Sequence, residues 1–325
     1  MTAGTPTTSH LRPVNPRTDL WAIADLIELC FSGQMDSDGR EYVRHLRRTA
    51  QNPETIQMIP GSNEQVASPL SGYVWVEDGR IVGNLTLIPF NRGGRWLYLI
   101  CNVAVHPDYR LRGIAQALTQ EGVQHVADQR AHAVWLQVRS DNPGAVHLYR
   151  KLGFRERAIR TTWVLPDILP LPPRVPLGYS VSKRRNSDWP QQRLWLNHTY
   201  PPAVTWNLAL NEDRFSPSLL RSIERFLAAE TLMQWSVFAG PTLCGVLTWE
   251  PHPTQEMIWP AVNPEFEPGA LLALLAYLRN EHPEDRRIVV NYPAGRAVSA
   301  FEQAGFYPLN TLIWMEIPLQ EVIHA

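Results

Sequence analysis

The sequence predicts an α+β fold with a mixed sheet, present in two tandem copies. Three observations lead to this prediction. Strand patterns come first, and strand and helix patterns then alternate to about residue 165. A proline-rich segment follows, and weakened copies of earlier segments then reappear in the same order. The chain of 325 residues is also long enough for two cores of about 150 residues each.

The first copy begins with a short strand and two helices. Residues 11–14 form the strand, and Asp19 is a candidate N-cap for an amphipathic helix that ends at Phe31. A second helix is expected from about Ser37 to Arg48. Residues 72–90 then alternate around an Asp-Gly pair, which predicts a β-hairpin.

The rest of the first copy alternates between strands and helices. We expect a strand at 95–105, a helix from Gly113 to about Gln129, a strand at 133–138, a short helix ended by Gly153, and a closing strand at 161–165. This order predicts a mixed sheet with helices packed against it.

Five prolines between residues 165 and 179 mark a domain boundary. Proline fixes φ and lacks an N–H group, so the segment should form an extended spacer. We therefore expect a flexible tail at 1–10, a first domain at 11–165, a linker at 166–177 and a second domain at 178–325.

Three segments after this linker repeat segments before it. GVLTW at 245–249 matches GNLTL at 83–87, VNPEF at 262–266 matches VHPDY at 105–109, and AVSAFEQAGF at 297–306 matches AVHLYRKLGF at 145–154. Three matches in the same order indicate a duplicated domain.

Composition excludes several classes of function. With 44% hydrophobic and 19% charged residues the chain is globular, and its apolar runs are too short to span a bilayer. A net charge of −1 argues against nucleic-acid binding. Three separated cysteines fit neither a disulfide framework nor a zinc site, and no histidines or carboxylates cluster at ligand spacing, so we expect no metal. The N-terminus lacks a secretory signal pattern, so we expect a cytoplasmic protein without membrane partners.

The stretch RLRGIA, residues 110–115, has the chemistry of an anion site. A helix start exposes N–H groups and the positive end of the helix dipole. Gly113 allows close backbone approach, and Arg110 and Arg112 add charged donors. These features suit a diphosphate. The stretch is neither a nucleotide P-loop nor a dinucleotide-binding turn.

Two motifs in the first copy resemble the GNAT superfamily of acyl-CoA N-acyltransferases. They are V-x-V-x-P-x-Y-R-x-x-G-I-A at 103–115 and N-P-x-A-x-x-L-Y-x-K-L-G-F at 142–154. The resemblance covers about residues 9 to 165 well and the second half in part. It implies a mostly antiparallel central sheet flanked by helices, with acetyl-CoA as cosubstrate.

The resemblance also implies roles for individual residues. Backbone groups of Val103 and Val105 would pair with the pantetheine arm, and Asn142 would lie beside it. Tyr149 would donate a proton to the departing CoA thiolate, since phenols and thiols have similar reference pKa values. The pyrophosphate would lie against the loop formed by Arg110, Leu111, Arg112, Gly113, Ile114 and Ala115.

The resemblance leaves the base that accepts the amine proton unidentified. Many family members carry a carboxylate just before V-x-V, where this chain has Cys101 and Asn102. A water chain, a carboxylate elsewhere or an already neutral amine would have to serve. Asp36, Asp38 and Glu41 lie in a region where the family often builds its acceptor pocket, but their spacing also fits a helix-capping pair.

The second copy lacks the residues that carry this chemistry. Alignment places Glu267 opposite Arg110 and Phe301 opposite Tyr149, and removes one residue before the glycine. A carboxylate repels phosphate, so we expect the second copy neither to bind acyl-CoA nor to catalyse. We expect it to shape the acceptor site or to replace a homodimer partner, so that the chain acts as a monomer with an intramolecular pseudo-dimer.

The sequence thus predicts an N-acetyltransferase that moves an acetyl group from acetyl-CoA to a primary amine by direct attack. The acceptor could be a small molecule or a peptide. The alternative is a non-catalytic acyl-CoA-binding sensor, which the missing base allows. A pure scaffold is less consistent with one copy that keeps Arg110, Gly113 and Tyr149.

Overall fold

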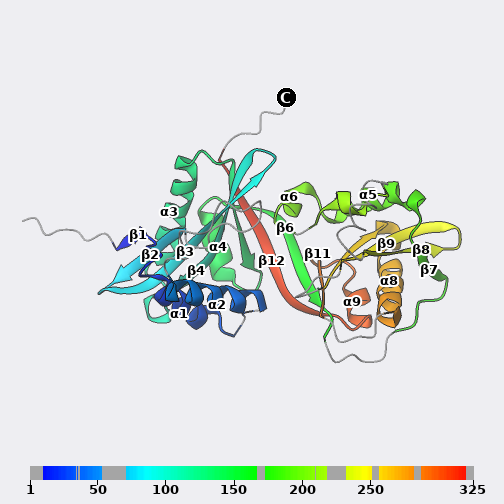
Figure 1. Cartoon of the computed structure of the whole chain (residues 1–325), viewed down its shortest axis with the longest axis horizontal. Helices are drawn as coiled ribbons and strands as arrows, with labels where there is room; N and C mark the ends of the chain where they lie inside the picture. Colours follow the sequence, from blue (N-terminus) through cyan, green and yellow to red (C-terminus); the bar gives the residue numbers. More distant parts are fainter. Residues whose placement is uncertain are drawn as a thin grey trace, which may run out of the picture. The chain divides into compact units, whose positions relative to one another are not determined.

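The computed structural model describes residues 10–52 except 34 and 36, 71–166, 173–217 except 209, 232–250, 256–281 and 287–319. It confirms the α+β class (Figure 1). The chain forms two compact units. Unit 1 contains Met1–Val138, Asn142–Glu156 and Trp314–Ala325, and unit 2 contains Arg139–Asp141 and Arg157–Ile313.

Unit 1 is built on a sheet of strand order β1-β2-β3-β4-β5. Neighbouring strands pair antiparallel except β4 and β5, which pair parallel. In chain order the elements are β1 (Leu11–Pro13), α1 (Leu20–Phe31), α2 (Ser37–Gln51), β2 (Gly72–Glu77), β3 (Arg80–Arg92), β4 (Arg95–Val105), a 3-10 turn (Pro107–Tyr109), α3 (Ile114–Asp128), β5 (Ala133–Arg139) and α4 (Pro143–Lys151).

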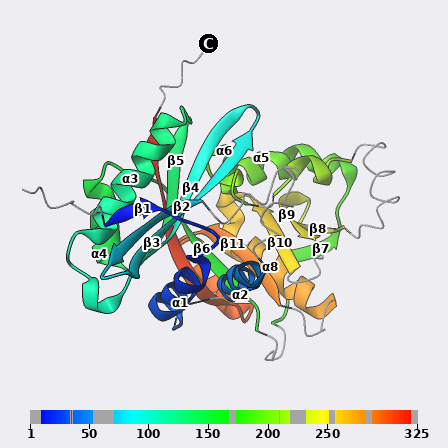
Figure 2. The ribbon, with the colours of Figure 1, turned by 60° about the vertical axis from the view of Figure 1, so that its left-hand side comes forward.

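The sheet of unit 1 carries helices on both faces, and alternate side chains of its strands pack against one face or the other. Val74 packs in the apolar cluster of α1 and α2, which lie side by side in Figures 1 and 2. On the opposite face a Cβ at Gly83 would lie 2.8 Å from Ile114 and 3.0 Å from Leu118 of α3. Gly83 therefore lets α3 pack directly onto β3, which places the start of α3 near the end of β4.

Unit 2 repeats this plan with a sheet of order β6-β11-β10-β9-β8-β7. Its main elements are β6 (Arg155–Val164), β7 (Tyr179–Lys183), α5 (Trp189–Thr199), α6 (Pro202–Thr205), β8 (Met233–Ala239), β9 (Thr242–Glu250), β10 (Glu256–Val262), a 3-10 turn (Pro264–Phe266), α8 (Glu267–Glu281), β11 (Ile288–Pro293), α9 (Val298–Gln303) and β12 (Tyr307–Pro318). On β10, Ile258 and Val262 face the core beneath α8, and Trp259 and Ala261 face the cluster beneath α5.

Equivalent hydrogen bonds confirm that the two halves are copies of one fold. The N–H of His106 donates to the carbonyl of Val82 at 2.9 Å, and the N–H of Asn263 donates to the carbonyl of Cys244 at 2.9 Å. Phe154 and Phe306 make the same backbone bond to the residue five positions earlier, at 3.0 and 2.9 Å. The order hairpin, strand, helix, strand, helix therefore occurs twice.

The two compact units are not divided at the expected domain boundary between residues 165 and 178, because strands β6 and β12 are assigned to them differently. Residues 157–164 of β6 belong to unit 2, and β12 contributes residues 307–313 to unit 2 and 314–318 to unit 1. Strands join whichever sheet edge pairs their backbone groups, so a compact unit need not follow sequence order. Residues 167–172 of the expected linker lie outside the described part of the chain.

The expected helix cap at Asp19 is wrong in one respect. Asp19 occupies the N-cap position of α1, but its side chain makes no capping bond to the helix. Its carboxylate instead accepts two hydrogen bonds from the Arg12 guanidinium, at 2.6 and 3.0 Å, and one from the N–H of Asn15 at 2.7 Å. A charged partner within reach competes for the carboxylate more strongly than a helix N–H group.

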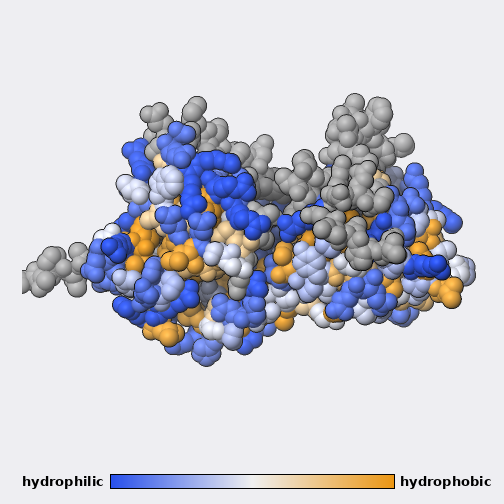
Figure 3. All heavy atoms as spheres, turned by 90° about the horizontal axis from the view of Figure 1, so that it is seen from below, coloured by the Kyte–Doolittle hydropathy of each residue, from blue (hydrophilic) through white to orange (hydrophobic). Residues whose placement is uncertain are grey.

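Hydrophilic and hydrophobic residues are interspersed on the face seen in Figure 3, in a chain with 30 basic and 31 acidic residues. No helix in the described residues has the length and hydropathy of a membrane span. The same described ranges contain no group of three or more His, Cys, Asp or Glu side chains placed to hold a metal ion.

Candidate functional site

Strands β4 and β5 of unit 1 diverge partway along their length. They pair from Leu97 opposite Ala133 to Ile100 opposite Leu136, and not beyond. The remainder of β4, residues 101–105, therefore presents an edge that β5 does not cover. The sequence-predicted residues Val103 and Val105 both lie on this uncovered segment.

The register of β4 against β3 decides which way these two peptide groups point. Val105 lies opposite Gly83, and the next N–H, of His106, bonds to Val82. Val105 and Gly83 are thus a non-hydrogen-bonded pair, so the peptide groups of Val105 point away from β3. By the two-residue period of a strand those of Val103 point the same way. An extended amide chain could add to β4 here as an extra strand.

The Val105 carbonyl is already an acceptor within the protein. The thiol of Cys30 donates to it at 3.3 Å, and Nε of Arg110 donates to it at 3.2 Å. A contact from Val105 to a ligand is therefore expected through its N–H group. The bond from Nε also anchors the Arg110 guanidinium, whose side chain lies against Cys30 as well.

The loop from Arg110 to Gly113 connects the 3-10 turn to helix α3. Leu111 has φ +62° and Gly113 has φ +81°, so both lie in the left-handed region. Such a loop turns successive N–H groups toward one side and forms a concave anion site. A Cβ at Gly113 would meet nothing within 4 Å. Glycine is therefore needed here for its backbone conformation and not because space is short.

The N-cap residue at the start of α3 makes no side-chain capping bond in the described part of the chain. Gly113 is the N-cap residue and has no side chain, so the first N–H groups of the helix lack a side-chain acceptor. Arg112 is held beside them: its Nη2 donates to the Asp108 carbonyl at 2.9 Å, and its guanidinium lies 4.8 Å from the centroid of the Tyr109 ring. Ile114 is buried against β3 at Gly83, and Ala115 is half-buried.

These features fit a diphosphate. The loop supplies N–H groups and a helix dipole, and two anchored guanidiniums supply positive charge with little further loss of side-chain freedom on binding. The uncovered edge of β4 leads to the loop and fits the amide groups of a pantetheine arm. The residues therefore fit acetyl-CoA.

Helix α4 carries the other two predicted site residues. Asn142 is its N-cap, and its Oδ1 accepts from the N–H of Ala145 at 3.1 Å, so this side chain has a structural role in the protein itself. Tyr149 is 7% exposed and packs edge-to-face on Phe154, with ring centroids 5.9 Å apart. In the described part of the chain its hydroxyl makes no hydrogen bond and is not among the fully enclosed polar atoms.

Burial raises the pKa of Tyr149 to about 12. The phenol therefore stays protonated at neutral pH, and it can give a proton to a thiolate, the conjugate base of a thiol with a pKa of about 8.5. That transfer is uphill, because the buried phenol is a weaker acid than the thiol, so the raised pKa opposes full proton transfer while the hydroxyl can still donate a hydrogen bond to the leaving sulfur.

A polar cluster that the sequence analysis did not identify lies where β4 leaves β5. Asn102 has φ +52° at a register shift between β3 and β4, which marks a β-bulge. Asn84, 1% exposed, donates from Nδ2 to the Asn102 carbonyl at 3.0 Å and holds the bulge. The Tyr42 hydroxyl of α2 hydrogen-bonds to Thr86 and to Asn102.

The signal for this cluster in the sequence is weak. Asn84 stands between apolar residues of a strand that is otherwise buried, where a polar side chain requires a buried partner. The sequence pattern around Tyr42 indicates only an ordinary residue of an amphipathic helix. Only the folded chain brings the two strands and α2 together at one point.

The missing base is not supplied by the thiol at position 101. Burial raises the pKa of Cys101 to about 12, so the thiol stays protonated at neutral pH. Asp36 and the side chain of Asp38 lie outside the described residues. Glu41 forms exposed ion pairs with Arg44 at 2.7 Å and with Arg48 at 3.2 Å on its own helix.

The corresponding place in unit 2 has a different structure. The 3-10 turn at 264–266 runs directly into α8, and Glu267 is already helical, with φ −50° and ψ −55°. In unit 1 the aligned residue, Arg110, is extended and opens a loop. The difference is therefore larger than the charge reversal seen in the sequence, because the loop itself is absent.

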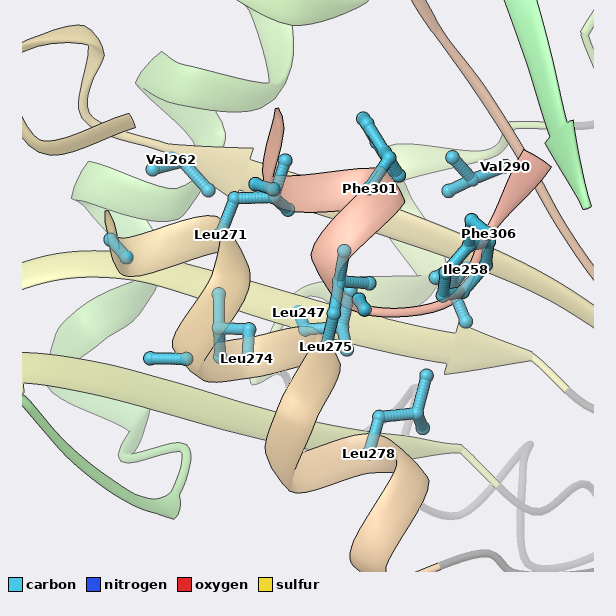
Figure 4. Packing of buried hydrophobic residues seen from close by; sticks show 14 of the residues in the cluster. Leu247, Ile258, Val262, Leu271, Leu274, Leu275, Leu278, Val290, Phe301 and Phe306 are labelled. Atoms are coloured by element: carbon cyan, nitrogen blue, oxygen red, sulfur yellow. The ribbon is translucent and has the colours of Figure 1, made fainter. Parts of the chain in front are cut away.

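The first turn of α8 carries a carboxylate of the protein itself. The Glu267 carboxylate, 8% exposed, accepts from the Tyr292 hydroxyl at 2.5 Å and from Arg296 at 2.7 and 3.1 Å. Phe301, aligned with Tyr149, is fully buried and stacks on Trp163 with centroids 4.8 Å apart. Figure 4 shows Phe301 among the leucines of α8 in the core of unit 2.

Comparison with known proteins agrees with the geometry of unit 1. Residues 34–154 match the acetyltransferase (GNAT) family model. The [ribosomal protein bS18]-alanine N-acetyltransferase of Escherichia coli K12 is 37% identical over 62 residues, which are 19% of this chain and 42% of that protein. The N-alpha-acetyltransferase RimI of Mycobacterium tuberculosis is 33% identical over 99 residues, 30% of this chain and 61% of that protein.

The chain thus spans less than two thirds of the length of either relative. Over its whole length it resembles a GCN5-related N-acetyltransferase from Sphaerobacter thermophilus, with a TM-score of 0.57, 16% identity, and coverage of 99% of both chains. This likeness shows the fold. Residues 34–154, with the motifs they contain, thus resemble the acetyltransferase (GNAT) family.

Proposed function

We propose that this protein is an N-acetyltransferase that transfers an acetyl group from acetyl-CoA to a primary amine, with all of the chemistry in unit 1. The observation that carries the proposal is the combination of an uncovered β4 edge with an uncapped, arginine-bearing start of α3. Acetyl-CoA supplies the acetyl group as a reactive thioester. The protein positions the reactants, and this supplies much of the acceleration.

The proposed roles follow from the positions of the residues. Arg110 and Arg112, with the N–H groups of residues 111–115, hold the diphosphate. The N–H groups of Val103 and Val105 hold the pantetheine arm, which leads toward the bulge at Asn102, and Asn142 lies beside it. Tyr149 protonates the sulfur of the leaving CoA.

We propose that the acceptor amine enters at the cluster of Tyr42, Thr86 and Asn102 on the bulge. These groups are neutral at physiological pH, since burial raises the pKa of Tyr42 to about 12. They can align an amine by hydrogen bonds without forming an ion pair with its protonated form. An α-amino group, with a reference pKa near 8, is then a better acceptor than a lysine side chain, with a pKa near 10.4.

The names of two relatives are consistent with this preference, since both specify acetylation of an α-amino group. We propose a peptide or small molecule with such an amine as the acceptor. We further propose that the second copy, with Glu267 in its anion site and Phe301 in place of Tyr149, does not catalyse. It shapes the acceptor site or takes the place of a homodimer partner, so that the chain acts as a monomer.

The test is the release of free CoA thiol with a panel of amines. The panel contains a peptide with an N-terminal alanine, the same peptide with its N-terminus blocked and an internal lysine, and an amino sugar. We expect thiol release with the first and little with the second. Tight binding of acetyl-CoA without release for any amine would contradict the proposal and indicate a sensor.

A further inference from the structure

Arg160, on strand β6 of unit 2, is a buried cation that no described carboxylate pairs. It is 2% exposed. Its Nη1 donates to the Thr199 carbonyl at 2.7 Å, its Nη2 donates to the Asn291 carbonyl at 3.0 Å, and its Nε donates to the side-chain oxygen of Asn291. All three acceptors are neutral. A guanidinium carries five N–H groups, so two remain.

The surrounding charges do not balance Arg160. Burial lowers its pKa, which reflects the cost of a charge at low dielectric, and the nearby Arg296 acts in the same direction. The carboxylate of Glu267 already accepts bonds from Arg296 and Tyr292. Two guanidiniums and one carboxylate leave an excess of one positive charge in the described cluster. Buried charges in proteins are normally paired.

Two hydroxyl groups beside Arg160 are buried without a hydrogen-bond partner in the described residues. They belong to Thr199, 0% exposed, and Tyr200, 1% exposed. The guanidinium carbon lies 4.9 Å from the centroid of the Tyr200 ring. An unpaired buried hydroxyl destabilises the folded protein, so two of them next to an unpaired cation require an explanation.

The cluster lies where the sheet of unit 2 is interrupted. Strands β10 and β11 pair at Glu256 with Ile288 and at Met257 with Val289, and then diverge. Asn291 lies beyond the last pair. Tyr200 comes from the cluster on the α5 face, and Tyr292 comes from the core on the α8 face. Side chains from both faces therefore meet at the divergence.

The free groups share one chemical property, since all of them can donate a hydrogen bond. The two remaining N–H groups can only donate, and the hydroxyls of Thr199 and Tyr200 can do so. A ligand that satisfies them must accept several bonds and carry negative charge. An excess of one positive charge favours a monoanion over a phosphate dianion, and full burial favours a small one.

We propose that Arg160, Thr199 and Tyr200 form a binding site for a small monocarboxylate in unit 2. The guanidinium binds the carboxylate through the N–H groups that Asn291 and Thr199 leave free, and the two hydroxyls bind its remaining lone pairs. The site uses no residue of the acetyl-CoA site in unit 1, so its test does not depend on the proposed transferase activity.

Acetate is the probe, titrated into the full-length protein at constant ionic strength while the midpoint of thermal unfolding is measured. We expect a saturable rise of the midpoint with acetate, and none with the neutral isostere acetamide or with chloride. An equal effect of acetate and chloride would overturn the carboxylate assignment. A crystal structure in acetate, with a carboxylate bonded to Arg160 and Tyr200, is the direct confirmation.

Variants separate the site from general ion effects. Tyr200→Phe keeps the ring and removes one donor to the anion, so it should weaken acetate binding by about tenfold. Tyr277→Phe, a partly buried tyrosine of the same unit that packs on Trp235, is the matched control and should bind as wild type does. Unchanged acetate binding in Tyr200→Phe would refute the proposal.

Arg160→Gln should abolish the response to acetate. If that variant does not fold, Tyr200→Phe and Thr199→Val decide the matter, because both preserve shape. A combined Arg110→Glu and Arg112→Glu variant should keep the full response to acetate. Loss of the acetate response in that variant would contradict a separate site in unit 2.

Discussion

The guanidinium of Arg296 holds the carboxylate of Glu267 through two contacts, of 2.7 and 3.1 Å, at the first residue of α8. At the equivalent place in unit 1 the N-cap residue of α3, Gly113, makes no side-chain capping bond, and Arg110 and Arg112 lie in the loop before it. The corresponding helix starts in the two copies thus differ in the charge that accompanies them. In unit 2 the anion belongs to the chain, and in unit 1 we propose that it comes from acetyl-CoA.

The Glu267 pair predicts a stability effect confined to unit 2. Arg296→Ala leaves a largely buried carboxylate with the Tyr292 hydroxyl alone, so we expect a loss of about 2 kcal/mol in the free energy of unfolding. Urea unfolding measures it. Arg193→Ala, which breaks an exposed pair with Glu212, is the control and should cost under about 0.5 kcal/mol. Equal losses of stability in the two variants would show that the Glu267–Arg296 pair stabilises the protein no more than an exposed ion pair does.

The left-handed backbone at Gly113 predicts separate effects on stability and on binding. Gly113→Ala should cost about 1 kcal/mol of stability, because a Cβ strains φ +81° even in open space. Gly79→Ala is a matched control with φ +76° and equally open surroundings, in the hairpin turn between β2 and β3.

Calorimetry with acetyl-CoA then distinguishes the two glycines. Both variants should lose similar stability, but only Gly113→Ala should bind the cosubstrate more weakly, by about tenfold, because the displaced loop N–H groups no longer face the diphosphate. Wild-type affinity in Gly113→Ala would mean that this loop does not contact the cosubstrate.

Tyr149→Phe tests the proposed acid. Removal of the hydroxyl should lower kcat by about a hundredfold and leave the Kd for acetyl-CoA within about twofold, because the proton transfer occurs only as the thiolate leaves. Tyr98→Phe, on β4 of the same unit, controls for the loss of a phenol. An unchanged kcat would remove Tyr149 from the mechanism.

The buried phenol of Tyr149 also predicts how stability depends on alkaline pH. Its pKa is raised from about 10 in the unfolded chain to about 12 in the folded protein. Above pH 10 the unfolded chain loses this proton before the folded protein does, so stability falls as pH rises from 10 toward 12, by up to about 1.4 kcal/mol per pH unit.

Urea unfolding at pH 9 and pH 11 measures this contribution. Tyr149→Phe should lose about 1 kcal/mol less stability than wild type between the two values. Parallel pH profiles for the two proteins would show that the hydroxyl is not buried in the folded protein.

The sequence predicts elements and repeats well because both depend on local pattern. The Asp-Gly hairpin, the helix after Gly113 and the short helix that carries Tyr149 all form where periodicity and turn residues place them. The repeat AVSAFEQAGF even preserves the backbone bond that ends its helix, from Phe306 to Phe301.

Pairing between distant segments is what the sequence could not predict. Whether Asp19 caps its helix depends on Arg12, which a strand brings within 2.6 Å. The cluster at Asn102 depends on Asn84 and Tyr42, from two other elements. The division of β6 and β12 between the compact units likewise depends on which strand edges pair. Such pairing leaves no pattern in the local sequence.

The most direct test of the central claim is calorimetry of acetyl-CoA binding to the full-length wild-type protein and to the double variant Arg110→Glu, Arg112→Glu. We predict one binding site per chain in wild type and a loss of at least a hundredfold in affinity in the variant, because two attractions become repulsions. Arg95→Glu, which makes the same charge change at the other end of β4, should bind as wild type does. Equal affinity in all three proteins, or a second site per chain, would contradict the account.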